Sequence, residues 1–391
     1  MSGCIKGSKD YVQYGMEMYK TGCKLFCIWL GPNPVVCVNH PDTFKQLIGE
    51  GLLISDGWKW ERIRKLLTPA FHFSILTGYV DIMNSASDDF QEKVIENMSA
   101  SPLVDIYPLV SRMTLDTMMK CSLSFDGSMQ AKMNEEYVKA VQRMGTLLRE
   151  HPLEVGHSDG KRRLDFLDIL LSAKDEQGRG LDRQEIQDEV DTFTFEGHDT
   201  TASALAWGIY ALGQYPDIQE KVYEDAKSVV GSKKHVDPGD LHAFKYIPIY
   251  IKEVLRYYTP VPVISRKSPN TIVLDGLEIP PGSRVDVPIY IMHHNPAIWK
   301  NPEDFRPERF SDKQKVEHEV FGFAPFSAGS RNCIGQVFAL NELKISLAKF
   351  VNRFEVRPDP GHKPDMLWDM ITRSTTGLKV CLKERSNRRQ C

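Results

Sequence analysis

Apolar residues recur at intervals of three and four along most of the chain, a period that predicts amphipathic helices. The longest such stretch begins after Asp182, which has Glu185 three residues later as in a capping box, and it ends before Pro216. At 1.5 Å per residue, a helix over 183–215 is about 50 Å long. Shorter helices are predicted over 41–47, 58–68, 83–98, 109–121, 129–149, 218–230, 248–258 and 336–350.

Short apolar runs bounded by turn-forming residues predict strands in three places. The runs 25–30 and 35–38 flank a turn rich in glycine and proline and indicate a hairpin. The stretch 271–291 alternates apolar runs with Asp-Gly and Pro-Pro-Gly turns, and the tail 370–382 also has strand character. Residues 1–20 carry no strong pattern, residues 151–161 form a polar break, and a proline-rich coil is expected over 295–326. Because no repeat or linker interrupts the chain, we expect one mainly helical (α+β) domain over residues 1–391, with small peripheral sheets.

The composition is that of an ordinary globular protein. Of the 391 residues 41% are hydrophobic and 26% charged, and the net charge of −3 gives no basic footprint for nucleic acid. No run of about 20 apolar residues occurs, so the chain as written is not expected to span a membrane. The N-terminus also lacks a signal-peptide pattern. The eight cysteines form no C-x-x-C pair and no zinc-type quartet, which favours a reducing compartment with most thiols in the core.

One cysteine differs from the others in its surroundings. Cys333 lies in the segment Pro325-Phe-Ser-Ala-Gly-Ser-Arg-Asn-Cys-Ile-Gly335, directly before a predicted helix. The amides and dipole of a helix N-terminus favour a thiolate, and a glycine lets a flat ligand approach the backbone closely. A buried structural cysteine is the alternative interpretation. Five positions share the spacing of one known pattern: Phe326, Gly329, Arg331, Cys333 and Gly335.

This segment resembles the haem-ligand loop of the cytochrome P-450 monooxygenases. The resemblance implies that Cys333 is the axial ligand of the iron in haem b (iron protoporphyrin IX), that Arg331 pairs with a haem propionate and that Phe326 shields the sulfur. Gly335 is a cofactor-binding position of the same pattern. Thiolate ligation pushes electron density onto the iron and favours O–O cleavage.

Two further segments match the same family. Glu253 and Arg256 stand three residues apart, on one face of a predicted helix, where an exposed ion pair is the alternative interpretation. The segment Asn301-Pro-Glu-Asp-Phe-Arg-Pro-Glu-Arg309 follows later in the chain, as it does in the family. The resemblance implies a buried structural triad of Glu253, Arg256 and Arg309, in which loss of one member leaves an uncompensated charge.

The longest predicted helix has an unusual centre. Residues 195–201 read Phe-Glu-Gly-His-Asp-Thr-Thr, and a glycine beside two β-branched threonines weakens a helix without local compensation. Such inconsistency is typical of functional sites. The segment resembles the oxygen-binding kink of the family, which implies that Asp199 and Thr200 are the catalytic acid–alcohol pair that delivers protons. A solvated acidic patch is the alternative.

Glu196 narrows the resemblance to the family-four branch, whose members ω-hydroxylate fatty acids and related lipids. It lies four residues before Thr200 on the same helix face, where most of the superfamily has a small apolar residue. In this branch the glutamate can form an ester with a haem methyl group. Without such a link, a carboxylate buried against a haem edge would be costly.

Other aromatic and basic residues resemble further cofactor contacts. Trp60 and Arg64 match a W-x-x-x-R pair that contacts a haem propionate, with ordinary cation–π packing as the alternative. Arg266 matches another propionate arginine. His293 and His294 have no third ligand nearby in the sequence, so we expect them to face solvent rather than to bind a metal.

The resemblance extends from about residue 24 onward, and two parts of the family pattern are missing from the chain as written. One is the N-terminal membrane anchor with its proline-rich hinge. The other lies between residues 149 and 161, where the family has two long helices and a loop that form the lid of the substrate channel. This chain has only a short polar stretch there, although lids exclude water and complete an active site.

The resemblance implies a monooxygenase that inserts one oxygen atom from O2 into a C–H bond near the end of a lipid chain. The implied location is the cytosolic face of the endoplasmic reticulum membrane. Electrons would come from NADPH through a separate flavoprotein reductase, because the chain has no dinucleotide-binding glycine-rich turn. Arg62, Lys65 and Lys344 are candidates for the basic surface that docks this acidic partner, with a merely solvated face as the alternative. Two other functions stay open: a haem-thiolate peroxide isomerase, against which the acid–alcohol pair argues, and an inactive haem-binding protein.

Overall fold

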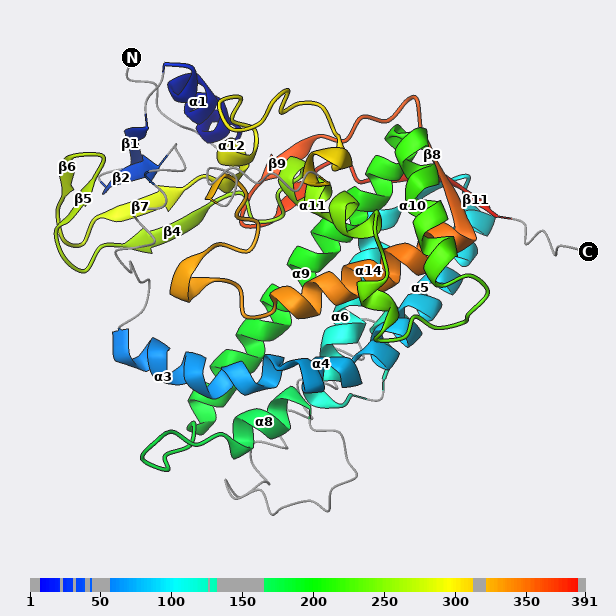
Figure 1. Ribbon diagram of the computed structural model, residues 1–391, viewed down its shortest axis with the longest axis horizontal. Coiled ribbons are helices and arrows are strands. Elements are labelled where there is room, and N and C mark those ends of the chain that lie inside the picture. The colour runs from blue at the N-terminus through cyan, green and yellow to red at the C-terminus, as the bar shows by residue number, and fades with distance from the viewer. Residues whose placement is uncertain are drawn as a thin grey trace, which may run out of the picture. The chain divides into compact units, whose positions relative to one another are not determined.

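The computed structural model describes residues 8–21, 24–30, 33–38, 43, 57–125, 127–131, 165–311 and 321–385 (Figure 1). The chain divides into two compact units whose segments alternate along the sequence. Unit 1 comprises residues 1–57, 249–333 and 365–376, and unit 2 comprises 58–248, 334–364 and 377–391. Nearly all of the predicted helices 41–47 and 129–149, and the whole polar break 151–161, lie outside the described residues.

Unit 2 is built around its longest helix, α9 (Arg183–Gln214). The Asp182 carboxylate accepts a hydrogen bond from the Glu185 N–H at 2.8 Å, and the Glu185 carboxylate accepts one from the Asp182 N–H at 3.0 Å. This is the predicted capping box, which satisfies amides that have no partner within the helix. The other helices of this unit are α3 (Gly57–Leu67), α4 (Phe73–Gly78), α5 (Val80–Ala100), α6 (Ile106–Leu123), α8 (Phe166–Ser172), α10 (Pro216–Val229) and α14 (Gln336–Arg353), with 3-10 turns at Thr68–Phe71 and Asp240–His242.

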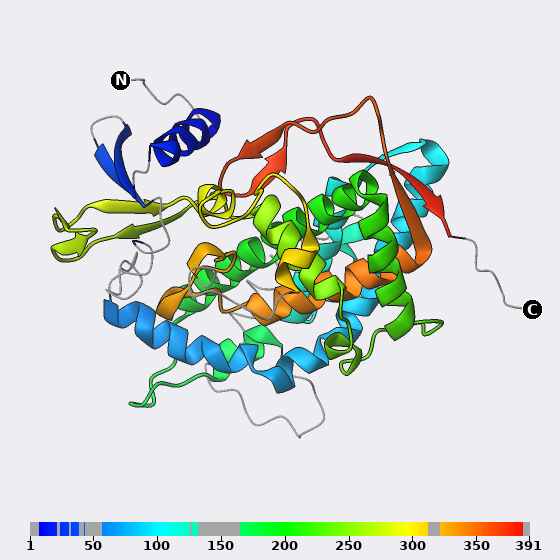
Figure 2. The ribbon, with the colours of Figure 1, turned by 45° about the horizontal axis from the view of Figure 1, so that its top comes forward.

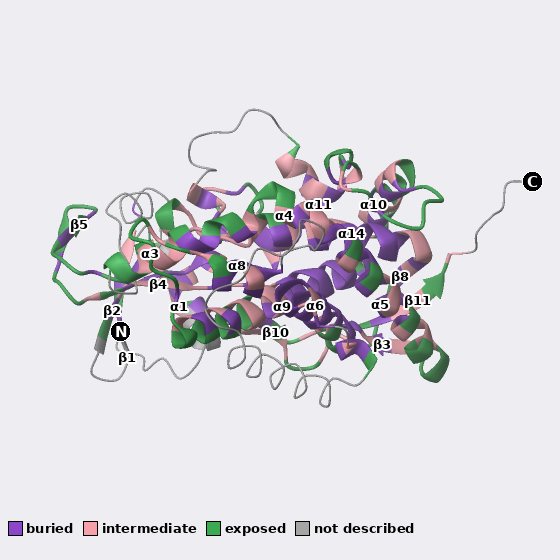
Figure 3. Cartoon of the chain, turned by 90° about the horizontal axis from the view of Figure 1, so that it is seen from below, coloured by how far each residue is buried: buried purple, intermediate pink, exposed green. Residues whose placement is uncertain are grey.

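The core of unit 2 lies where α9 packs against α6 and α14, and Figure 3 shows buried residues concentrated on these helices. Residues 201–213 of α9 are buried on every side, as expected of a helix in the centre of a bundle. A Cβ atom on Gly213 would lie 3.2 Å from the backbone of Arg357, so the glycine permits close approach of strand β8. This strand (Phe354–Pro358) belongs to an antiparallel sheet of order β3-β11-β8 with Leu103–Asp105 and Lys379–Glu384.

Unit 1 contains the main sheet, of order β1-β2-β7-β4 (Figure 2). Strands β1 (Leu25–Leu30) and β2 (Asn33–Val38) form an antiparallel hairpin. Strand β2 pairs in parallel with β7 (Arg284–Val287), and β7 pairs antiparallel with β4 (Ile264–Lys267). Two antiparallel pairs accompany it: β5 (Ile272–Leu274) with β6 (Leu277–Ile279), and β9 (Met366–Trp368) with β10 (Thr372–Ser374). Its helices are α1 (Ser8–Lys20), α11 (Ile247–Tyr257) and α12 (Ile289–His293), with 3-10 turns at Pro307–Phe310 and Gly329–Arg331.

The predicted fold class is confirmed, since helices dominate the described residues and the sheets are small and separate. The hairpin at 25–38 is also confirmed. Two local features were not predicted. Residues 8–20 form a helix, whose apolar side is made largely by Tyr14 and Met18 packed on the hairpin. The stretch 271–291 holds three strands but ends in α12, where Ile289, Ile291 and Met292 are all buried.

Among the described residues, no single helix has both the length and the hydropathy of a membrane span. The bent pair of helices Gly57–Phe71 and Phe73–Ala100 meets these criteria together.

Candidate functional site

The cysteine segment forms a loop at the end of unit 1 that hydrogen bonds hold closed. The Cys333 N–H donates to the Phe326 carbonyl at 2.9 Å, and the Ser327 N–H donates to the Ala324 carbonyl at 3.0 Å. Ser327 and Gly329 take left-handed backbone angles, with φ of 59° and 73°, which glycine adopts without steric cost. The Cys333 residue is exposed, which excludes a buried structural cysteine. Its thiol is therefore presented on the surface of a backbone-fixed loop.

The remaining residues of the motif continue this arrangement. Arg331 lies in the 3-10 turn of the loop and is partly buried, as is Phe326. Gly335 is the N-cap of α14, and its carbonyl accepts the first helical bond from the Ala339 N–H at 2.9 Å. Cys333 thus precedes the first helical residue, Gln336, by three positions.

Arg266 on β4 places a positive charge against this loop. Its Nη2 donates to the Ser327 hydroxyl at 3.2 Å and its Nη1 to the Ser265 carbonyl at 2.9 Å, and both acceptors are neutral. Burial lowers the pKa of the Arg266 guanidinium, because little water remains to solvate the charge. A half-buried cation with neutral acceptors can accommodate an anionic group. The loop and Arg266 therefore fit a group that combines a metal for the thiolate with a carboxylate for the cation, as haem does.

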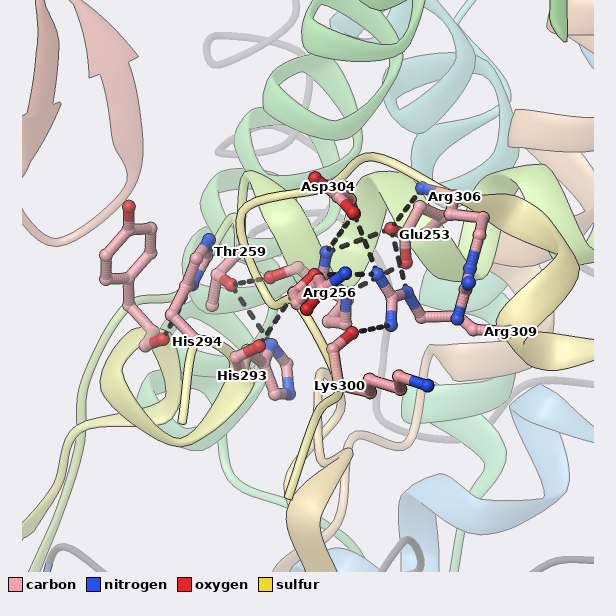
Figure 4. Close-up of polar contacts among 11 residues, drawn as sticks. Glu253, Arg256, Thr259, His293, His294, Lys300, Asp304, Arg306 and Arg309 are labelled. Atoms are coloured by element: carbon pink, nitrogen blue, oxygen red, sulfur yellow. Dashed lines mark hydrogen bonds and ion pairs between the residues drawn. The ribbon is translucent and has the colours of Figure 1, made fainter. Parts of the chain in front are cut away.

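The structure brings the three triad residues together in unit 1 (Figure 4). The Glu253 carboxylate accepts bonds from Arg256 Nε at 2.8 Å, Arg256 Nη2 at 2.9 Å and Arg309 Nε at 3.1 Å. It also accepts the Arg306 N–H at 2.7 Å. Glu253 and Arg256 have no solvent exposure, which excludes the exposed ion pair. The cluster carries two guanidinium groups on one carboxylate, so each member depends on the others.

The expectation that His293 and His294 face solvent is wrong. Their exposed fractions are 0% and 1%, although neighbouring side chains point to different sides of a helix. The physical reason is that α12 is a single turn buried all round. The His294 ring stacks on Tyr290 at 4.2 Å between centroids, and burial lowers the pKa of His294 to about 3, with a further decrease from the charge of Arg256. Both histidines are therefore neutral at pH 7.

Asp199 and Thr200 on α9 point to different neighbours within unit 2. Asp199 is 3% exposed, which excludes a solvated acidic patch, and its Oδ1 accepts a bond from the Tyr107 hydroxyl of α6 at 3.1 Å. Thr200 keeps some exposed surface, and its hydroxyl donates to the Glu196 carbonyl at 2.8 Å. Tyr107 is a site neighbour that sequence reasoning missed, because a single tyrosine at a helix start carries no distinguishing signal.

Gly197 lies close to helix α6. A Cβ atom there would lie 2.7 Å from the Met118 Sδ of α6, closer than real atoms approach. The Thr201 hydroxyl donates to the Gly197 carbonyl at 3.1 Å, a bond that α9 accommodates without interruption. A larger residue at position 197 would therefore require the Met118 side chain to shift.

Glu196, Trp60 and Arg64 complete the predicted cofactor positions in unit 2. Glu196 keeps exposed surface, but desolvation of its carboxyl group by the surrounding protein raises its pKa. Trp60 and Arg64 lie one turn apart on α3 and are both partly buried. They share a helix face, as predicted from their spacing.

Two of the three residues considered for reductase docking are committed to the fold of unit 2. The Arg62 side chain is 14% exposed and forms ion pairs with Asp175 at 2.9 Å and Glu185 at 3.3 Å. Lys344 donates to the Leu241 carbonyl at 2.9 Å, and burial lowers its pKa. Only Lys65 is largely exposed, with Glu176 at 3.7 Å. Arg62 and Lys344 therefore have partners within the unit, whereas Lys65 offers most of its side chain to solvent.

Glu342 on α14 is a buried acid that the sequence did not single out. It has no solvent exposure, and neither carboxyl oxygen has a hydrogen-bond partner of normal geometry among the described residues. The neighbouring Thr117 lowers the pKa of Glu342, but its effect is smaller than that of burial, and the Thr117 hydroxyl donates to the Met113 carbonyl. Desolvation dominates and raises the pKa of Glu342 to about 8.

Replacing Glu342 with glutamine is expected to stabilise the protein as the pH rises. The folded-state pKa of about 8 exceeds the ordinary value of 4.5, so the folded chain holds a proton that the unfolded chain releases between these values. Wild-type stability therefore falls as the pH rises through this window, whereas glutamine does not ionise. Urea unfolding should show that the advantage of Glu342→Gln grows with pH, to a few kcal/mol near pH 8. The exposed Glu61→Gln is the control, and an unchanged pH dependence in Glu342→Gln would contradict the assignment.

Comparison with known proteins places these residues in a family. The family model described as "Cytochrome P450" matches residues 47–156 and 151–382. Cytochrome P450 4A2 of Rattus norvegicus is 39% identical over 385 positions, which cover 86% of this chain and 76% of the relative. Cytochrome P450 4F4 of the same species is 35% identical over 442 positions, covering 93% and 84%, and human Cytochrome P450 4F2 is 34% identical over 442 positions, covering 93% and 85%.

The comparisons also show a difference in length between this chain and its relatives. An alignment of 442 positions exceeds the 391 residues of this chain, so the relatives have residues where this chain has none. The family model matches in two parts that overlap at residues 151–156, within the stretch 149–161 where a shortened lid is expected. The match nevertheless covers most of the chain, including the cysteine loop, the triad and the centre of α9. The chain belongs to the cytochrome P450 family of monooxygenases, in its family-four branch.

Proposed function

We propose that this chain hydroxylates a lipid at or near the end of its hydrocarbon chain, taking electrons from NADPH through a separate flavoprotein reductase. Family membership implies a haem iron cofactor, O2 and a lipophilic substrate. The observation that carries the proposal is Cys333, exposed on a loop that the Phe326–Cys333 backbone bond holds closed. The lipid substrate is supported by the Glu196 motif and by the 4A and 4F relatives.

The cofactor-binding residues would each contact a different part of the haem, a flat group with two negatively charged propionates. Cys333 would supply the thiolate ligand, and Arg266 and Arg331 would face propionates. Trp60 and Arg64 would add an aromatic and a cationic contact from α3. When bound, the haem activates O2 so that one oxygen atom enters a substrate C–H bond and the other leaves as water. This reaction consumes two electrons and two protons, so the chain must also conduct protons to the site.

Thr200 and Asp199 are proposed to supply those protons. The Thr200 hydroxyl can rotate from the Glu196 carbonyl to donate elsewhere, because its side chain keeps exposed surface. Asp199 is held in place by the Tyr107 hydroxyl, which donates to its Oδ1 at 3.1 Å. The two groups thus provide a donor at the site and a buried acid behind it.

The direct test of this function is turnover by the purified protein. With reductase, NADPH and a fatty acid, we expect a terminally hydroxylated product that depends on all three. A lipid hydroperoxide without reductase tests the isomerase alternative, and haem titration alone tests the inactive alternative. Rearrangement of the peroxide without reductase, or haem binding with no product in either assay, would refute the proposal.

Thr200→Ala is expected to uncouple the enzyme while keeping its haem. Loss of the hydroxyl interrupts ordered proton delivery, so reducing equivalents should appear as hydrogen peroxide instead of hydroxylated lipid, lowering product per NADPH about tenfold or more. Thr201→Ala is the matched control, because Thr201 also donates to the carbonyl four residues earlier but is 2% exposed. Equal coupling in Thr200→Ala and Thr201→Ala would count against the relay.

We further propose that Glu196 would become covalently attached to a haem methyl group as an ester during early turnover. A methyl C–H bond would break and a C–O bond to the carboxylate would form, a two-electron oxidation in which O2, with two electrons from the reductase and two protons, is the oxidant and leaves as water. Desolvation raises the pKa of Glu196, which is the environment in which forming a neutral ester removes an unfavourable charge. The link would fix the orientation of the cofactor and stiffen the channel, favouring a chain terminus over weaker internal C–H bonds.

The covalent link is tested by acid denaturation after turnover, followed by chromatography and mass spectrometry. We expect haem mass on the peptide that contains Glu196, lost in Glu196→Ala and retained in Glu189→Gln, a half-buried acid two turns earlier on α9. Haem that separates completely from the wild-type polypeptide would remove the covalent proposal and leave ligation by Cys333 untouched. Repeating the measurement with the relatives' lid residues restored tests whether the shortened region prevents attachment.

The location proposed from the resemblance is the cytosolic face of the endoplasmic reticulum membrane. Lys65 remains an exposed cation for reductase docking, whereas Arg62 and Lys344 are engaged within unit 2. Reductase titration of Lys65→Glu should therefore raise the reductase concentration at half-maximal rate, and Arg62→Ala should act mainly on stability.

A further inference from the structure

His293 has both ring nitrogens committed to partners within unit 1. Its Nε2 lies 3.1 Å from the Ala324 backbone N, and an amide N–H can only donate, so Nε2 is the acceptor. In a neutral ring the proton is then on Nδ1, which donates to the Thr259 hydroxyl at 3.0 Å. The Thr259 hydroxyl donates in turn to the Arg256 carbonyl at 2.7 Å. The partners thus assign one tautomer.

A further hydrogen bond, to the backbone of His293, connects this residue to the Glu253 triad. The His293 carbonyl accepts Arg256 Nη1 at 2.8 Å, so Arg256 binds both Glu253 and the helix that carries His293 (Figure 4). Thr259 has a φ of 39°, which is unusual for a β-branched residue. Bonds to its hydroxyl and to its carbonyl, which accepts the Thr372 hydroxyl at 2.7 Å, hold it there.

On the other side, His293 reaches the start of the cysteine loop. Ala324 is the residue whose carbonyl accepts the Ser327 N–H, and the next closing bond joins Phe326 to Cys333. The ring of Phe323 lies 5.3 Å from the His293 ring and covers it. Hydrogen bonds therefore link Glu253 to Arg256, Arg256 to His293 and His293 to Ala324, and the backbone continues from Ala324 into the turn that carries Cys333.

We propose that His293 is a positioning residue that ties the first turn of the cysteine loop to the Glu253 triad and so sets the position of the Cys333 sulfur. The inference rests on the proposed function only in taking Cys333 as the haem ligand. Full burial lowers the pKa of His293 well below its ordinary range, and the neighbouring His294 ring and Arg256 lower it further. The ring thus keeps the neutral form in which Nε2 can accept.

Two variants, His293→Asn and His293→Gln, test the hydrogen bonds of the two ring nitrogens separately. Asparagine places a donor amide near the position of Nδ1 and has no acceptor at the position of Nε2, so His293→Asn keeps the Thr259 bond and loses Ala324. Glutamine reaches the position of Nε2 with its carbonyl oxygen, so His293→Gln keeps an acceptor for Ala324. A role specific to the loop predicts that these two variants differ.

The first readout is alkylation of Cys333 in the haem-free full chain, followed by peptide mass spectrometry. We expect His293→Asn to change the Cys333 rate about fivefold, as loss of one hydrogen bond would, and His293→Gln to stay within about twofold of wild type. The exposed Cys27 on β1 is the internal control and should react equally in all three proteins. Equal Cys333 rates in the two variants would overturn the proposal.

The second readout is spectroscopic and applies to haem-loaded protein. In the reduced, carbon-monoxide-bound state, His293→Asn should convert a larger share of the red-shifted thiolate band to the unshifted band than His293→Gln. If the wild type shows no thiolate band, the proposed function fails, and the alkylation rates still decide the role of His293.

Amide hydrogen exchange of the wild type keeps the inference testable if either variant does not fold. A bond to a fully buried imidazole predicts slow exchange of the Ala324 amide. Exchange as fast as that of the exposed Ser330 in the same loop would overturn it.

Discussion

Cys333→Ala is expected to abolish lipid hydroxylation while the chain remains folded. Cys333 is exposed, so truncating its side chain should change the free energy of unfolding by no more than about 0.5 kcal/mol. The same truncation removes the thiolate that we propose as the iron ligand, which would supply electron density to the haem iron. NADPH-dependent product formation with reductase should therefore fall to background, while urea unfolding stays close to that of the wild type.

Cys381→Ala is the matched control for this substitution. Cys381 lies on strand β11 of unit 2 and is partly exposed. Its replacement by alanine is the same chemical change at a position with no proposed ligand role. It should retain wild-type turnover. Measurable hydroxylation by Cys333→Ala, or an equal loss in Cys381→Ala, would mean that the wrong cysteine has been assigned.

Glu253→Ala is expected to give the largest loss of stability among single substitutions in unit 1. Glu253 neutralises Arg256, which is fully buried, and Arg309, whose side chain is 5% exposed. Removing the carboxylate leaves two buried guanidinium groups without their anion, which costs about 3–5 kcal/mol. Urea unfolding should show this loss, and the purified protein should carry little haem.

Glu278→Ala tests whether the effect belongs to the triad. Glu278 is an exposed glutamate on β6 of the same unit, so its truncation should change the free energy of unfolding by less than about 0.5 kcal/mol. If Glu253→Ala unfolds at the same urea concentration as Glu278→Ala, the buried triad does not contribute as described.

Sequence pattern predicted those parts of the fold that local physics determines. The start of α9 follows from the reciprocal capping bonds of Asp182 and Glu185, and its end from Pro216, so the helix appears within one residue of its prediction. Helix α1 was missed because its apolar face acquires meaning only through packing of Tyr14 and Met18 on the hairpin. Local pattern cannot report such contacts.

The same limit applies to the candidate site. Cys333 and the triad were singled out by resemblance, because their segments have the residue types and spacing of family motifs. Spacing could not reveal that His293 is fully buried or that Tyr107 donates to Asp199 from another helix. Nor could it reveal that Gly197 is matched to Met118 by close packing. These properties arise from segments far apart in the sequence, so they required the folded structure.

The absorption spectrum of the reduced, carbon-monoxide-bound wild-type protein tests the central claim most directly. A haem whose axial ligand is the Cys333 thiolate gives a carbonyl band shifted to long wavelength relative to haem with a nitrogen or neutral thiol ligand. We predict this red-shifted band in the wild-type chain. A carbonyl band at the unshifted position only, in a protein that has bound haem and remains folded, would contradict the assignment of this chain as a haem-thiolate monooxygenase.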